Sequence, residues 1–164
     1  MSGRLSPEPH VTHLIPVKTR PMVPPQDDIW DVLSQALPPL EEGDVVAITS
    51  KIVAIHQGRC IAAADVSDKE HLVEAEADAW IPNASSRYGI TLAIKGGTLI
   101  ASAGIDASNA ADHFVLWPAD PSGAAAEIGR ALKARYGLSN LGVILTDSHC
   151  TRHAYRAPSP WLSF

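Results

Sequence analysis

The 164-residue sequence predicts a fold of the α+β or mixed α/β class. Short apolar runs rich in β-branched residues alternate along the chain with segments of helical periodicity. One pair of such runs is joined by Lys95-Gly96-Gly97, which is typical of a hairpin turn. A hairpin beside strand–helix–strand units favours a mixed sheet with flanking helices over a regular doubly wound sheet. With 46% hydrophobic residues, the chain can bury the core of one domain.

The first part of the chain is expected to contain a flexible lead-in, two strands and a helix. Residues 1–12 are mostly polar and contain prolines, which indicates the lead-in. Residues 13–17 have the pattern of a short strand. Apolar residues recur at helical spacing over 28–37, before a pair of prolines that ends the helix. Residues 45–48 are continuously apolar and predict a buried strand.

Two helices are expected in the next stretch. Thr49 or Ser50 is suited to cap a short helix that ends at Gly58, although a strand that continues through residue 55 fits the pattern equally well. A strand that leads into a hydroxyl-capped helix start offers backbone N–H groups to an anion. A capping-box pattern at residues 67–70 then predicts a helix over 68–80.

The second half of the chain predicts the hairpin, a strand, a helix and a final strand. Residues 90–94 and 98–101 form the arms of the hairpin. Residues 113–117 predict another strand, which ends at a proline. An Asp-Pro-Ser start at 120–122 opens a helix that ends at Gly137, and residues 141–145 form the last strand.

Composition and charge exclude several classes of function. The net charge is −5 and the sequence has no run of Lys or Arg, so we expect no nucleic-acid partner. No apolar run is long enough to span a membrane, and the N-terminus lacks an apolar signal core, so the expected location is the cytoplasm. Cys60 and Cys150 are the only cysteines and are expected to be free thiols.

Two acidic loops that follow predicted strands form the candidate functional site. Asp106 and Asn109 lie in the loop after the hairpin, while Asp147 and Ser148 follow the last strand. Carboxylate and hydroxyl oxygens are ligands that Mg²⁺ or Mn²⁺ prefers, and such an ion usually serves phosphate chemistry. Asp and Asn are also common turn residues that bond to their own backbone, so a purely structural turn is the alternative for each loop.

Other chemical sites find less support in the sequence. His149, Cys150 and His153 suggest a zinc ion, but a structural zinc site needs four ligands and the usual Cys-x-x-Cys pair is missing. No sequence feature supplies a base for a nucleophilic Cys150. The sequence contains neither a phosphate-binding loop of the Walker type nor a dinucleotide fingerprint.

Several motifs, in order, resemble the coenzyme F420-0:γ-glutamyl ligase family. They are Ile15-Pro-Val17, Gly43-Asp-Val-Val-Ala-Ile-Thr-Ser-Lys51, Gly104-Ile-Asp-Ala-Ser-Asn109, Asp120-Pro-Ser122 and Ile144-Leu-Thr-Asp147. The resemblance implies a mixed α/β fold, a homodimer, and the ligation of L-glutamate to a deazaflavin phosphodiester with GTP and Mg²⁺ or Mn²⁺. It also implies an acyl-phosphate intermediate. The resemblance does not fix the acceptor substrate of this chain, and an amino acid other than L-glutamate is an alternative co-substrate.

The resemblance assigns roles to individual positions of this sequence. Asp106 and Asp147 match metal-binding acids, and Ser148 replaces the usual Thr beside them. Four other residues match positions that contact or line the nucleotide site: Pro16, Val17, Ser50 and Asn109.

The sequence departs from the family pattern in two places. Ala54-Ile55 stands where the family has a second Ser-Lys, so we expect Lys18 or Arg20 to replace the missing lysine. Residues 150–164 match no family segment, which indicates a ligase-like domain over 13–149 that is incomplete, followed by an unrelated tail. The alternative function is an inactive remnant that serves as a nucleotide- and metal-binding or assembly module. In either case we expect a homodimer in which packing orders residues 154–164.

Overall fold

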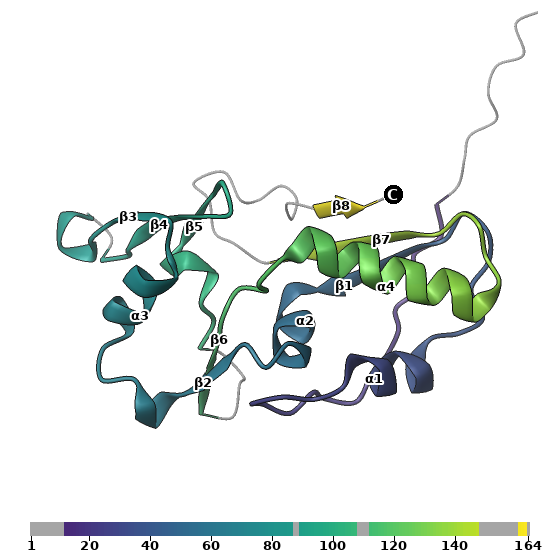
Figure 1. Ribbon diagram of the computed structural model, residues 1–164, viewed down its shortest axis with the longest axis horizontal. Coiled ribbons are helices and arrows are strands. Elements are labelled where there is room, and N and C mark those ends of the chain that lie inside the picture. The colour runs from purple at the N-terminus through teal and green to yellow at the C-terminus, as the bar shows by residue number, and fades with distance from the viewer. Residues whose placement is uncertain (1–11, 87–88, 108–111, 148–160, 164) are drawn as a thin grey trace, which may run out of the picture.

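The structure is a computed structural model that describes residues 12–86, 89–107, 112–147 and 161–163 (Figure 1). Within these residues, four helices and eight strands confirm the predicted mixture of α and β structure. The main elements are, in chain order, α1 (Ile29–Ala36), β1 (Val45–Thr49), α2 (Ser50–His56), β2 (Cys60–Ala62), α3 (Lys69–Glu76), β3 (Ala79–Ile81), β4 (Leu92–Lys95), β5 (Thr98–Ala101), β6 (His113–Val115), α4 (Pro121–Tyr136), β7 (Gly142–Thr146) and β8 (Trp161–Ser163). Three short 3₁₀ turns are η1 (Ala63–Asp65), η2 (Asn83–Ser85) and η3 (Ser102–Gly104).

A sheet with the strand order β1-β7-β8 forms one half of the molecule. Strands β1 and β7 are parallel, with Val45 beside Gly142 and Thr49 beside Thr146, while β8 pairs antiparallel with β7. Because the first two strands end at the same register position, the residue after each strand emerges at the same edge. Ser50 and Asp147 are these two residues, so the sheet itself places them together.

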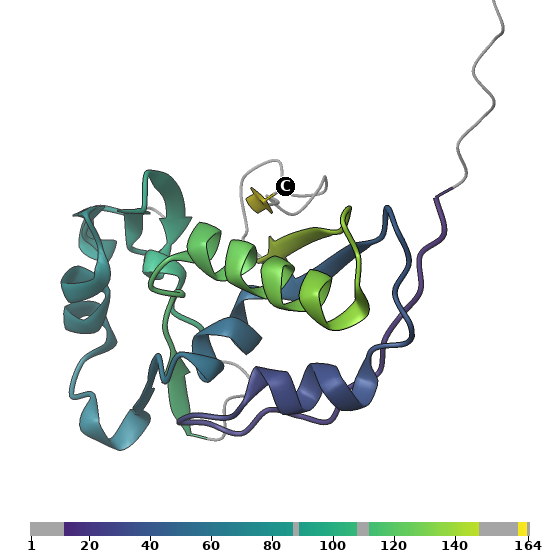
Figure 2. The same ribbon diagram turned by 45° about the vertical axis from the view of Figure 1, so that its right-hand side comes forward.

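Apolar side chains of α1, α2 and α4 pack against β1 and β7 in the largest core of the protein. Figure 2 shows α4 running alongside the strands of this sheet. Full burial of one such aliphatic side chain contributes about 1.5–3 kcal/mol, so this core accounts for much of the stability of the half that holds Ser50 and Asp147. Its buried members are Ile29, Leu33, Ile48, Val53, Ala125, Ile128, Leu132, Leu141, Val143 and Leu145.

The other half contains the antiparallel sheet β3-β4-β5 and α3, and Figure 1 shows it at the opposite end of the molecule. The short pair β2-β6 lies between the halves. Arg59 also joins them, because its Nη2 is 2.5 Å from Glu76 Oε2 and its Nε donates to the carbonyl of Trp117 at 3.1 Å. Lys95 Nζ is 3.1 Å from the same Glu76 oxygen. Across the described residues, no helix is both long and apolar enough to cross a membrane.

Several predicted elements are confirmed. The segment after Thr49 is a helix and does not continue as a strand, and the hairpin forms with β4 and β5 as its arms. Helix α4 begins after Asp120, whose Oδ1 accepts the Gly123 N–H at 2.9 Å. It ends at Gly137, whose φ of +69° is the left-handed conformation typical of a helix C-terminus.

Two predicted elements are wrong. Residues 13–17 form no strand: they pair with no strand among the described residues, and the side chain of Leu14 is 94% exposed. The predicted helix over 68–80 ends at Glu76, because residues 79–81 pair with β4 as strand β3. Backbone pairing with a distant segment therefore overrides the local helical pattern at the end of this helix. The sequence reading also missed the short strands β2 and β8.

The carboxylate of Glu42 holds the turn after α4 against the start of β1. Its two oxygens accept the N–H groups of Ser139 and Asn140 at 2.7 and 2.6 Å. These hydrogen bonds favour the ionised form and lower the pKa of Glu42 below its usual value. A carboxyl group with a lowered pKa in the folded state contributes stability above its unfolded pKa, and this contribution is lost as the pH falls through the folded pKa.

We therefore expect Glu42→Gln to have a lower midpoint of thermal unfolding than wild type at pH 7. On acidification below about pH 4, near the usual pKa of Glu, the midpoint of the variant should fall less than that of wild type. Circular dichroism at a series of pH values measures both effects. Glu41→Gln is the matched control, since Glu41 is an exposed neighbour whose carboxylate bonds to no other described residue. Parallel pH profiles of wild type and Glu42→Gln would contradict the role of this carboxylate.

Candidate functional site

Ser50 and Asp147 meet where β1 and β7 end. Ser50 Oγ donates a hydrogen bond to Asp147 Oδ1 at 2.8 Å, and the Ser50 side chain is buried. The two residues are 97 positions apart in the sequence, so the parallel pairing of β1 and β7 creates this contact. The hydrogen bond fixes one oxygen of the carboxylate and leaves the Asp147 side chain directed toward the first turn of α2.

Asp106 reaches the same turn of α2 from the other half of the molecule. Its Oδ2 lies 2.5 Å from Lys51 Nζ, and the two side chains are 39% and 29% exposed. Its backbone is held by an antiparallel bridge with Val115, through N–H···O bonds of 2.9 and 2.8 Å. Consecutive residues, Ser50 and Lys51, thus each bind one of the two predicted metal-binding acids.

The short turn η3 directs the chain from β5 to Asp106. Ser102 and Ala103 both have a φ of +51°, which is unusual for residues with a side chain, and Gly104 follows with a φ of +74°. Gly104 lies against the ring of the buried Trp117, so there is no room for a side chain at this position. The glycine of this motif therefore has a structural role, because it allows the turn that leads to Asp106.

Of the predicted site residues, the structure joins Ser50 directly to Asp147, and it pairs Asp106 with Lys51, the neighbour of Ser50 in α2. The predicted nucleotide-lining residues Pro16 and Val17 are exposed, in a segment without regular structure. The remaining predicted ligands and the alternative zinc or thiol residues lie outside the described residues; they are Asn109, Ser148, His149, Cys150 and His153. Cys60 is a free thiol, as predicted.

Lys51 and Arg20 differ from what the sequence predicted for basic residues at the site. Sequence reasoning did not assign a role to Lys51, although it belongs to the Thr-Ser-Lys motif that carries the family resemblance. Arg20, which we expected to replace the missing family lysine, binds Asp27 with both of its terminal nitrogens, at 2.6 and 2.8 Å. This ion pair holds the pKa of Asp27 well below its usual range and engages Arg20 within its own loop.

The donor atoms of the site suit a divalent cation of the hard class. Two carboxylates and a hydroxyl are oxygen ligands of the kind that Mg²⁺ and Mn²⁺ prefer. The position of Lys51 Nζ against Asp106 shows that a positive charge is accommodated at this carboxylate. Within the described part of the chain, no three His, Cys, Asp or Glu side chains gather as a complete metal site, so the two acids would need further ligands.

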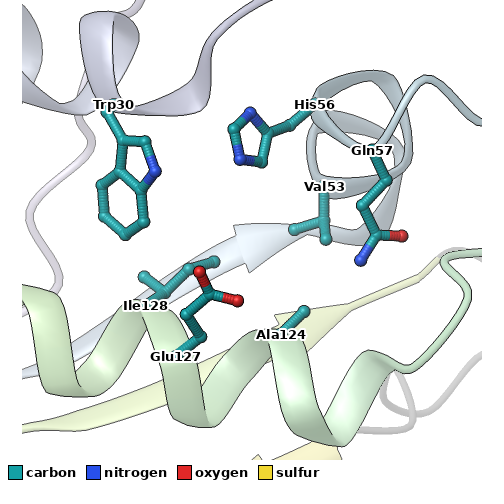
Figure 3. Close-up of a pocket in the computed structure, with 7 residues that line it drawn as sticks. All are labelled: Trp30, Val53, His56, Gln57, Ala124, Glu127 and Ile128. Carbon is teal, nitrogen blue, oxygen red and sulfur yellow. The ribbon is translucent and has the colours of Figure 1, made fainter.

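A separate pocket of about 120 Å³ lies at the other end of α2 (Figure 3). Its walls come from α1, α2 and α4, and Figure 3 shows Trp30 and Glu127 on opposite sides of it. The Ile29 N–H donates to His56 Nδ1 at 3.3 Å, and the rings of Trp30 and His56 meet edge to face with centroids 6.3 Å apart. These contacts join α1 to the C-terminal end of α2, whose first turn holds Ser50 and Lys51.

Comparison with known proteins identifies the group to which these features belong. The family model described as F420-0:Gamma-glutamyl ligase matches residues 17–160. The protein named Coenzyme F420:L-glutamate ligase from Methanopyrus kandleri is 30% identical over 153 residues, covering 81% of this chain and 58% of that protein.

Two further proteins of the same name are similar. The one from Archaeoglobus fulgidus is 26% identical over 150 residues, covering 83% of this chain and 59% of its own length. The one from Methanosarcina barkeri is 28% identical over 150 residues, with 82% and 58% covered. The chain thus spans less than two thirds of the length of these curated relatives.

Proposed function

The chain belongs to the F420-0:gamma-glutamyl ligase family, and on this premise we propose that it is an amino-acid ligase that adds L-glutamate to a coenzyme F420 precursor. The observation that supports this most directly is that consecutive residues of α2 bind the two acids: Ser50 bonds to Asp147 where β1 and β7 end, and Lys51 pairs with Asp106. The residues arrive from three distant parts of the chain, and their oxygen donors suit a cation that accompanies phosphate groups.

We propose that GTP is the co-substrate and that Mg²⁺ or Mn²⁺ is held by Asp106 and Asp147, with Ser148 beside them and Asn109, Pro16 and Val17 toward the nucleotide. When bound, such a cation neutralises negative charge on the phosphoryl oxygens. Ser50 orients Asp147 through its 2.8 Å hydrogen bond, and the bridge to Val115 fixes the backbone of Asp106. Both acids are therefore held in place by the fold before any ligand arrives.

The proposed reaction proceeds in two steps. A carboxylate oxygen of the acceptor attacks the γ-phosphorus of GTP, and the bond to the GDP oxygen breaks, which gives an acyl phosphate and GDP. The amine nitrogen of L-glutamate then attacks the acyl carbon, inorganic phosphate leaves, and the nitrogen loses a proton as the amide forms. Neither step needs a covalent bond to the protein, so a site that only positions the reactants and balances their charge is sufficient.

A second candidate is a nucleotide- and metal-binding module without ligase activity. It is favoured by Ile55, which stands where the resemblance expects a lysine and is only 4% exposed. Ile55 packs with Ala54 and Val115 in a small core cluster, so this position supplies no charge to a nucleotide. The two candidates share the binding of metal and nucleotide and differ in product formation.

Calorimetric titration of GTP with and without Mn²⁺ tests the binding that both candidates require. We expect GTP to bind measurably tighter in the presence of Mn²⁺, because the cation offsets the repulsion between the triphosphate and the two carboxylates. GTP binding that does not depend on Mn²⁺, or no binding under either condition, would contradict the proposed site.

We also propose that the chain forms a homodimer. The outer face of the β3-β4-β5 sheet supports this, because it exposes apolar side chains from all three strands: Ile81, Leu92, Ile94 and Leu99. Contiguous exposed apolar surface of this kind commonly marks a protein interface.

A further inference from the structure

The ion pair between Lys51 and Asp106 joins two residues whose backbones are both fixed. Lys51 is the second residue of α2, and Asp106 forms the backbone bridge to Val115. The 2.5 Å separation of Lys51 Nζ and Asp106 Oδ2 places a full positive charge on a carboxylate of the proposed metal site. Neither side chain is fully exposed, so solvent screens this interaction only in part.

The charge of the ammonium group makes Asp106 Oδ2 a weaker ligand for a metal ion. An ammonium group has three N–H donors and no lone pair, so it cannot act as a ligand, and its charge repels a cation. The contact of Ser50 with Asp147 differs in kind, because a hydroxyl oxygen has lone pairs that can face a cation while its hydrogen bonds the carboxylate. A divalent cation at Asp106 therefore binds more tightly when Lys51 moves away, whereas Ser50 can remain in place.

The sum of charges indicates when this displacement is favourable. Asp106, Asp147 and Lys51 together carry one negative charge, which a divalent cation converts to one positive charge. Phosphate groups that arrive with the cation bring compensating negative charge and offer the ammonium group another partner. Lys51 has a flexible four-carbon stem, so its charge can move from the carboxylate to a phosphate oxygen without a change in the helix.

We propose that Lys51 is a built-in counter-ion of Asp106 that competes with the divalent cation, so that metal and phosphate-bearing co-substrate bind cooperatively. This inference rests on the proposed function, because it concerns the same metal and nucleotide. Thermodynamic linkage requires the coupling to be reciprocal: the nucleotide tightens metal binding by the same factor by which the metal tightens nucleotide binding.

Calorimetry of Mn²⁺ binding, without nucleotide and with a non-hydrolysable GTP analogue, tests the competition. We expect Lys51→Met to bind Mn²⁺ alone roughly tenfold more tightly than wild type, because the competing charge is gone. The increase in Mn²⁺ affinity that the analogue causes should be smaller in Lys51→Met than in wild type. Lys51→Arg keeps the charge and should behave like wild type. Lys69→Met is the matched control for net charge, since Lys69 is exposed at the start of α3.

The outcomes separate this inference from the function on which it rests. Unchanged or weaker Mn²⁺ binding by Lys51→Met would overturn the competition while leaving the metal site intact. If Lys51→Met does not fold, Lys51→Gln takes its place: Mn²⁺ binding tighter than that of wild type supports the inference, and binding no tighter than that of wild type overturns it. A wild-type chain that binds no Mn²⁺ under either condition would overturn the proposed function itself.

Discussion

Replacement of Gly104 by alanine is expected to destabilise the protein by about 2–5 kcal/mol. The φ of +74° at this position costs a residue with a side chain about 1–2 kcal/mol. An added Cβ would also overlap Trp117 Cε3, and would lie 3.1 Å from Trp117 Cζ3 and 3.2 Å from Ile100 Cδ1. Both neighbours are buried, so neither side chain can move away without disturbing the core, and overpacking of this kind typically costs about 1–3 kcal/mol more.

Gly97→Ala provides the matched control. Gly97 has a φ of +73°, nearly that of Gly104, but no atom lies within 4 Å of the Cβ that alanine would add. The control should therefore show only the backbone cost. Urea denaturation followed by circular dichroism measures both variants, and equal losses of unfolding free energy would contradict the close packing of Gly104 against Trp117.

The second large effect is expected for Asp147→Asn, which removes one charge of the proposed metal site. The amide oxygen of asparagine can still accept the hydrogen bond from Ser50 Oγ, so the fold should persist. Loss of even an outer-shell partner commonly weakens metal binding by about 10–100-fold. We therefore expect loss of a ligand carboxylate to weaken Mn²⁺ binding by about a hundredfold or more, as measured by calorimetry.

Two further variants distinguish a specific metal site from an effect of net charge. Asp65→Asn removes an exposed carboxylate from η1, in the other half of the molecule, and should leave Mn²⁺ binding unchanged. Ser50→Ala keeps both carboxylates but releases Asp147, so a weaker effect than that of Asp147→Asn is expected. If Asp65→Asn and Asp147→Asn weaken binding equally, the effect reflects net charge and not a site.

Local patterns in the sequence were sufficient for elements that depend on local interactions. Asp28 and Asp120 each cap the helix that follows, and Gly137 ends α4, as sequence rules predict. The error at Trp80 arose because the residue pairs with Ala93 in a sheet, and such pairing is invisible in a window of neighbouring residues. The error at residues 13–17 has the converse cause, because a short apolar segment forms a strand only where a partner strand is available.

Local sequence patterns also predicted part of the candidate site. Asp106 and Asp147 were identified because each follows a predicted strand, and the parallel register of β1 and β7 explains why one of them meets Ser50. The pairing of Asp106 with Lys51 was not predictable, because it depends on the turn at η3 and the bridge to Val115, which bring two distant backbones together. Sequence order alone does not contain that geometry.

The most direct test of the central claim is the formation of a glutamyl product. The chain is incubated with coenzyme F420-0, L-glutamate, GTP and Mn²⁺, and the acceptor is analysed by mass spectrometry. Ligase function predicts an acceptor heavier by one glutamyl group in the wild-type reaction, which requires GTP and is lost in Asp147→Asn. A wild-type chain that binds Mn²⁺ and GTP but forms no glutamyl product would contradict ligase function and favour the binding module.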